Sequence, residues 1–131
     1  MKYIVVVNRA PQEPGCMDAN RELEGLYTLN GYKKLLMNRL NVLLLNHTQN
    51  RYDTIAQEIY LIEPDTNVLY DGGDHSIYYD TPHSSCNKAD SQVLNNETIK
   101  FRVYNKRGRQ DMTMDEIFSM LEKELNVIGE Q

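Results

Sequence analysis

The chain has 131 residues, of which 40% are hydrophobic and 25% are charged, and its formal net charge is -5 at pH 7. These values are typical of a globular domain, and this length supports a core without disulfide or metal staples. The mild acidity argues against broad, non-specific binding to nucleic acid or to a membrane surface, although it leaves room for a local basic site. We therefore expect a single domain over residues 1–131.

The first third of the chain contains one predicted strand and two predicted helices. Residues 2–8 include a run of β-forming side chains without polar alternation, which predicts a strand buried on both faces. Residues 9–16 carry two prolines and a glycine and are expected to form a loop. Apolar residues recur at helical spacing over 18–31 and over 32–45, so we expect a helix in each range. The last turn of the second range could also form a strand, because a short apolar run does not distinguish the two.

The middle of the chain predicts a β-hairpin, a further short strand and a long loop. Residues 55–62 have the composition of a strand, and the turn-forming residues 63–67 separate them from a second strand at 68–70. Another short strand is expected at 76–79. Residues 81–96 are rich in Ser, Asn and Asp with little to bury, which predicts a loop of unusual length for a compact domain.

The C-terminal part predicts a strand, a polar loop and a helix. Apolar and polar residues alternate over 98–104, as expected for a strand with one buried face. Residues 105–111 are polar and are expected to form a loop. Thr113 is a good N-cap, and Glu116 three residues later completes a capping box, so we expect a helix over 113–128.

Together these elements predict an α+β fold. We expect an antiparallel or mixed sheet of about five strands with two or three helices packed on one face, the last of them being the helix at 113–128. No apolar run is long enough for a signal-peptide core or a membrane span, so we expect a cytoplasmic protein with no membrane partner.

The first candidate site is a basic cluster between the last predicted strand and the last predicted helix. Free backbone N–H groups at a helix N-terminus favour an anion, and guanidinium groups match phosphate or carboxylate. The cluster therefore predicts a site for a nucleotide, a nucleic-acid backbone or an acidic patch on a partner. The alternative is a solvated turn whose cations balance neighbouring acidic residues, since charged loops are common. The members of the cluster are Lys100, Arg102, Lys106, Arg107 and Arg109.

The second candidate site is a set of metal-ligand side chains within residues 71–86. Its strongest members are Asp74, His75, His83 and Cys86. Such residues could hold zinc or a catalytic divalent ion, but no second pair of zinc ligands lies close in the sequence. The alternative is a structural turn, because Asp and Gly residues are what a turn requires. We expect no cofactor.

The third candidate site is aromatic. The chain has nine tyrosines, two phenylalanines and no tryptophan. Tyrosine offers a large contact area with a polar group at little cost in conformational entropy, which suits a binding surface. Cross-strand packing on a half-exposed sheet would favour the same residue type. The tyrosines concerned lie in and around the predicted hairpin and are Tyr60, Tyr70, Tyr78 and Tyr79.

The sequence has no catalytic signature of the nucleophile-elbow, P-loop or dinucleotide-binding type. We therefore expect a small cytoplasmic, non-enzymatic binding or regulatory protein that occupies the surface of another protein or protein complex. Abundant Asn, Tyr and Ile with scarce Ala point to an AT-rich bacterial or phage genome, which fits an inhibitor from a phage or mobile element. Nucleic acid is not excluded as a partner, and the oligomeric state stays open.

The alternative function is binding of a phosphorylated small molecule such as a nucleotide, or metal-assisted hydrolysis of a phosphoester. This alternative predicts a concave pocket in which arginines converge. The phosphate would be held by Arg102, Arg107 and Arg109, and any chemistry would fall to Asp74, His75 or His83.

Overall fold

The computed structural model describes residues 3–11, 19–49, 51, 53–63, 73–81 and 97–129. These residues form six strands and two helices. In chain order they are β1 (Tyr3–Pro11), β2 (Ala19–Tyr27), α1 (Leu29–Thr48), β3 (Thr54–Ile62), β4 (His75–Asp80), β5 (Phe101–Asn105), β6 (Gly108–Met112) and α2 (Met114–Gly129).

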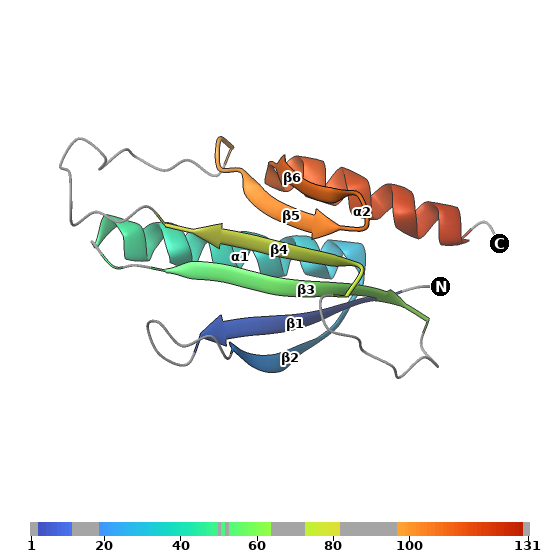
Figure 1. Ribbon diagram of the computed structural model, residues 1–131, viewed down its shortest axis with the longest axis horizontal. Coiled ribbons are helices and arrows are strands. Elements are labelled where there is room, and N and C mark those ends of the chain that lie inside the picture. Colours follow the sequence, from blue (N-terminus) through green and yellow to red (C-terminus); the bar gives the residue numbers. More distant parts are fainter. Residues whose placement is uncertain are drawn as a thin grey trace.

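The strands form one antiparallel sheet in the order β2-β1-β3-β4-β5-β6. Both helices pack on the same face of it, with α1 running along the sheet behind β3 and β4 and α2 beside β5 and β6 (Figure 1). One main core joins the two helices to the sheet. The α+β class is therefore confirmed, and in the described ranges the sheet has six strands where about five were predicted.

The helix predicted at 32–45 is present as α1, which is longer at both ends. Thr28 is its N-cap, and its hydroxyl accepts a hydrogen bond of 3.2 Å from the backbone N–H of Gly31. The buried residues Tyr32, Leu36, Leu40 and Leu43 follow helical spacing and face the sheet. The last turn, which could have been a strand, is helical.

Strand β1 is buried on both faces, as predicted, although it begins and ends later than residues 2–8. Ile4 and Val6 belong to the main core under the helices. Val5 and Val7 belong to a second cluster with Tyr60 on the opposite face. Strand β1 is also an interior strand of the sheet, with β2 on one side and β3 on the other.

The helix predicted at 18–31 is wrong, because Ala19–Tyr27 is strand β2. The register of β1 and β2 shifts between Val6 and Val7, so Leu26 lies opposite Val5 and Leu23 opposite Val7. This β-bulge places two leucines that are three residues apart on the same face, and such spacing imitates a helix. Gly25 adopts a φ of +151°, which is not helical and which L side chains rarely adopt.

The loop predicted at 105–111 is also wrong, because Gly108–Met112 is edge strand β6, paired with β5. The two strands form a hairpin with a turn at residues 106–107, and the strand predicted at 98–104 is reduced to Phe101–Asn105. Strand β6 is mainly polar and exposed, so it lacks the apolar alternation that reveals a strand. The capping box is confirmed, with reciprocal hydrogen bonds of 3.1 and 3.3 Å between Thr113 and Glu116 at the start of α2.

A partly buried ion pair fastens the C-terminal half of α1 to the residue before β3. Arg39 donates hydrogen bonds of 2.9 and 2.8 Å to the two carboxylate oxygens of Asp53. The side chain of Asn46 and the backbone N–H of Thr54 donate to the same carboxylate. Although desolvation acts to raise it, these hydrogen bonds hold the pKa of Asp53 below its ordinary value.

The strand predicted at 55–62 is confirmed as β3, and the one at 76–79 as β4. The strand predicted at 68–70 and the loop predicted at 81–96, apart from Thr81, lie outside the described residues. In the part of the chain that the structure covers, neither helix combines the length and the apolar character needed to cross a lipid bilayer.

Candidate functional site

The β5–β6 hairpin divides the basic cluster between two places. Arg102 lies on β5 opposite Asp111, and Arg109 lies on β6 opposite Tyr104. Because these residues alternate with the buried Phe101 and Val103, their side chains are on the sheet face away from the helices. The remaining two cations of the hairpin, at positions 106 and 107, are in the turn. The cluster is therefore not one site.

The arginines on the strands are paired with carboxylates. Arg102 Nη2 lies 2.7 Å from Asp80 Oδ2, and Arg109 Nε lies 3.2 Å from Asp111 Oδ1. Lys100 is exposed just before β5. Hydrogen bonds from Thr113 lower the pKa of Glu116, and the charge of Lys100 adds a smaller contribution. None of these three cations lines the pocket at the hairpin turn.

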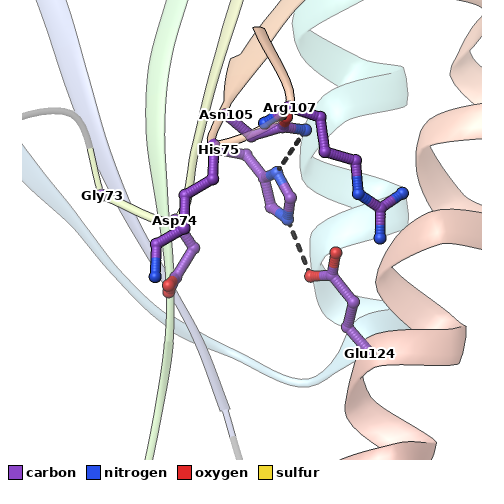
Figure 2. A pocket seen from close by; sticks show the side chains of 7 residues that line it. Gly73, Asp74, His75, Asn105, Arg107 and Glu124 are labelled. Carbon is purple, nitrogen blue, oxygen red and sulfur yellow. Dashed lines mark hydrogen bonds and ion pairs between the residues drawn. The ribbon is translucent and has the colours of Figure 1, made fainter.

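The turn itself borders a pocket of about 480 Å³. Two groups that the sequence singled out separately meet there, since Lys106 and Arg107 come from the basic cluster and Asp74 and His75 from the Asp/His segment. Figure 2 shows the imidazole of His75 between the side chains of Asn105 and Glu124, with the Arg107 guanidinium on the α2 side of the ring. The lining residues are Gly73, Asp74, His75, Asn105, Lys106, Arg107 and Glu124.

A chain of hydrogen bonds orders the wall of this pocket. The backbone N–H of Arg107 donates to Asn105 Oδ1 at 2.9 Å, which turns the amide nitrogen of Asn105 toward His75 Nδ1 at 3.3 Å. His75 Nδ1 therefore accepts, and the ring proton is on Nε2, which donates to Glu124 Oε2 at 2.7 Å. Both nitrogens of the His75 ring are used in these hydrogen bonds. Its side chain is only 6% exposed.

Strand β3 positions His75 through the two residues before it. Gly73 adopts a φ of +62°, and a Cβ at this residue would come within 2.6 Å of the carbonyl oxygen of Ile59. The backbone N–H of Asp74 donates to that same oxygen at 2.8 Å. Asp74 Oδ2 accepts a hydrogen bond of 2.7 Å from the backbone N–H of Leu61. The chain thus enters β4 in a fixed conformation with the imidazole directed under α2.

The described residues of the Asp/His segment are committed to this network. Among the residues that the structure covers, no three His, Cys, Asp or Glu side chains come together as a set that could hold a metal ion. His83 and Cys86 lie outside the described residues. Of the four predicted metal ligands, the structure therefore describes only Asp74 and His75.

The predicted tyrosines are distributed over both faces of the sheet. Tyr79 is on the helix side against Phe101, with 5.8 Å between ring centroids, and its partial burial raises its pKa. Tyr60 is buried on the other face, where its hydroxyl donates to Glu58 Oε1 at 2.7 Å. Tyr78 is on that same face but half-buried. Tyr70 lies outside the described residues.

Tyr78 belongs to a surface cluster that the sequence reading did not assemble. Its ring and that of Tyr104 are in edge-to-face contact, with centroids 5.7 Å apart at an interplanar angle of 73°. The Arg102 guanidinium carbon lies 5.8 Å from the centroid of the Tyr78 ring. We name Tyr78, Arg102, Tyr104 and the paired Asp80 the tyrosine–arginine face.

Sequence reasoning missed several residues of these sites, among them Tyr104, Asn105 and Glu124. Tyr104 shares the polar face of its strand with Arg102, so the alternation over 98–104 could have found it. Asn105 precedes a turn and carried no signal beyond its residue type. Glu124 is partly buried on α2, 49 positions from His75, and no local pattern relates the two.

Comparison with known proteins identifies no family for this chain. No protein-family model matches the chain, and no match was found among curated proteins or solved structures.

Proposed function

We propose that this protein is a non-enzymatic binding protein with a regulatory or inhibitory role, and that it contacts a partner protein through the tyrosine–arginine face. The observation that supports this proposal is the cluster itself: the Tyr78 ring contacts both the Tyr104 ring and the Arg102 guanidinium on the sheet face that carries neither helix. Tyrosine and arginine are enriched at protein interfaces and dominate their binding energy.

The cluster is ordered before any partner arrives. Asp80 holds the Arg102 guanidinium at 2.7 Å, and the same carboxylate accepts a hydrogen bond from the hydroxyl of Thr54. Side chains that are already fixed in one arrangement lose less conformational entropy on binding, which favours affinity. Tyr104 is still 38% exposed, so a large part of its ring would be buried by a partner.

The charges of this face favour a protein over a nucleic acid. Arg102 and Arg109 are each paired with an aspartate, so the two arginines bring no surplus of positive charge toward a phosphate backbone. Binding to nucleic acid depends largely on such a surplus. A protein surface can contact tyrosine rings and neutralised ion pairs without it.

Cross-strand packing is the competing explanation of the same contacts. Tyr78 and Arg102 are directly paired across β4 and β5, and such pairs stabilise sheets. The two explanations differ in what a substitution changes. A packing role predicts loss of stability with no effect on binding, whereas an interface role predicts loss of binding with little effect on stability.

The test is affinity capture from cells of the encoding organism, with quantitative comparison of the tagged protein and its variants. Tyr104→Ala and Arg102→Ala should lose a captured protein that the unmodified chain retains. Lys34→Ala is the matched control, because Lys34 is exposed on α1 on the opposite face of the sheet, and this variant should retain the partner. Equal capture by all four proteins, with the tyrosine and arginine variants correctly folded, would refute the proposal.

A further inference from the structure

The two cations of the hairpin turn differ from Arg102 and Arg109 on the strands in forming no ion pair with a described residue. Lys106 and Arg107 are exposed neighbours, and within the described ranges no carboxylate forms an ion pair with either of them. Two adjacent like charges repel each other, and a two-residue turn does not require them. Their place beside a pocket indicates an anion from outside the chain.

The opposite wall of the pocket carries an acceptor. Glu124 Oε2 receives the proton of His75 Nε2, while Oε1 has no hydrogen-bond partner within the part of the chain that the structure describes. The Glu124 side chain is 31% exposed. As a carboxylate, Glu124 brings a negative charge to this wall of the pocket. A bare phosphate placed on Arg107 would be repelled by that charge, whereas a ligand that also offers a hydrogen-bond donor would be attracted.

We infer that this pocket binds a small phosphomonoester that also carries an amino or hydroxyl group, with the phosphate on Lys106 and Arg107 and the donor group on Glu124. His75 and Asn105 are positioning residues, because their polar atoms are used in holding Glu124 and the Arg107 backbone. The site is separate from the tyrosine–arginine face, and the two share no residue.

The surroundings accommodate a ligand larger than the phosphate and its donor group. A second cavity of about 430 Å³ is lined in part by the same Arg107 and Glu124. Its other walls include the methionines at positions 112 and 120 on β6 and α2, which offer adaptable apolar contact. Together the two cavities fall within the range of volumes found for small-molecule sites.

The inference can be tested with two probes that differ in one group. Ethyl phosphate offers only the phosphate, and O-phosphoethanolamine offers the same phosphate with an amino group. Each is titrated into the uniformly ¹⁵N-labelled full chain at constant ionic strength, so that screening stays the same. Saturable shifts are expected at the backbone N–H signals of Arg107 and Gly108, with O-phosphoethanolamine bound more tightly than ethyl phosphate.

Three variants assign the binding to the named groups. The double variant Lys106→Ala/Arg107→Ala should bind O-phosphoethanolamine at least about ten-fold more weakly, because two charge-assisted contacts are lost. Glu124→Gln keeps an acceptor for His75 and should remove the preference for O-phosphoethanolamine over ethyl phosphate. Arg109→Ala is the control: this arginine is exposed on the adjacent strand and paired with Asp111, so its loss should leave both affinities unchanged.

Several results would overturn the inference. Shifts that rise linearly without saturation would show that there is no site. Unchanged binding by the double variant would place the anion elsewhere. Equal weakening by Arg109→Ala would show that the ligand is attracted by the overall positive charge of the hairpin and not by specific contacts. A Glu124→Gln variant that keeps the full preference would remove Glu124 from the site. Thermal unfolding of each variant checks that it is folded, and the exposed turn substitutions should leave the unfolding temperature unchanged.

Discussion

The tyrosine–arginine face and the pocket at the hairpin turn both draw residues from β4 and from the β5–β6 hairpin. They differ in whether their cations are paired with carboxylates. On the face, Arg102 is neutralised by Asp80, and its neighbour Arg109 is neutralised by Asp111. At the pocket, Lys106 and Arg107 have no ion-pair partner among the described residues. The difference teaches that a hairpin separates charges that are adjacent in sequence, so a basic cluster is not evidence of a single basic surface.

The largest effect is expected at the glycine on which the pocket depends. Gly73→Ala should lower the free energy of unfolding by about 2 to 4 kcal/mol, from backbone strain together with the approach of Cβ to the Ile59 carbonyl. Gly108→Ala, in the hairpin, meets nothing within 4 Å and should cost only the strain of its φ of +93°, about 1 to 2 kcal/mol. Urea unfolding measures both values. Equal losses would mean that contact with β3 does not fix the entry to β4.

The next prediction compares the stability contributed by two ion pairs: the partly buried pair that fastens α1 and the exposed pair of the tyrosine–arginine face. Asp53→Asn weakens the hydrogen bonds from Arg39 and should cost about 1 to 2 kcal/mol. Asp80→Asn removes the partner of Arg102 at the surface and should cost about 0 to 0.5 kcal/mol. Urea unfolding at neutral pH compares the two, and a larger loss for Asp80→Asn would reverse this ranking.

The same pair predicts a pH dependence. Because the pKa of Asp53 is lower in the folded chain than in the unfolded chain, its contribution to stability is complete above the unfolded value and is lost as the pH falls through the folded value. The difference in unfolding free energy between the unmodified chain and Asp53→Asn should therefore be greatest near neutrality and shrink in acid. Urea titrations over a series of pH values measure it. A difference that grows in acid would contradict the lowered pKa.

The last pair of substitutions compares tyrosines on the two faces of the sheet, and only a small loss of stability is expected on the tyrosine–arginine face. Tyr104→Ala removes one half-exposed ring from a cross-strand contact and should cost about 0.5 to 1 kcal/mol. Tyr79→Ala, one layer away on the helix side, removes a ring that packs on Phe101 and should cost about 3 kcal/mol. Chemical unfolding gives both values. A Tyr104 variant as unstable as the Tyr79 variant would assign the ring to folding rather than to binding.

The elements that sequence reasoning predicted correctly are those with complete local signals. The capping box at Thr113 and Glu116 determines where α2 begins, and the leucine spacing determines the buried side of α1. Strand β2 was missed because a bulge at Glu24 and Gly25 reproduces helical spacing. Strand β6 was missed because an exposed edge strand has no apolar side to reveal it.

The candidate sites could be predicted by residue type but not by arrangement. Lys106, Arg107 and His75 were named as separate candidates, and the structure brings them to one pocket. Their convergence depends on the pairing of β4 with β5, and the role of Glu124 depends on how α2 packs on the sheet. Both are long-range properties that residue spacing does not encode.

The separation of the two sites can be measured directly from the arginine side chains. The Nε–H signals of Arg102, Arg107 and Arg109 are followed by ¹H–¹⁵N NMR while O-phosphoethanolamine is added at constant ionic strength. A saturable shift of the Arg107 signal alone, with the two paired arginines unchanged, is the result expected from the structure. Shifts of all three signals with one common affinity would show a single basic surface and contradict the division made by the β5–β6 hairpin.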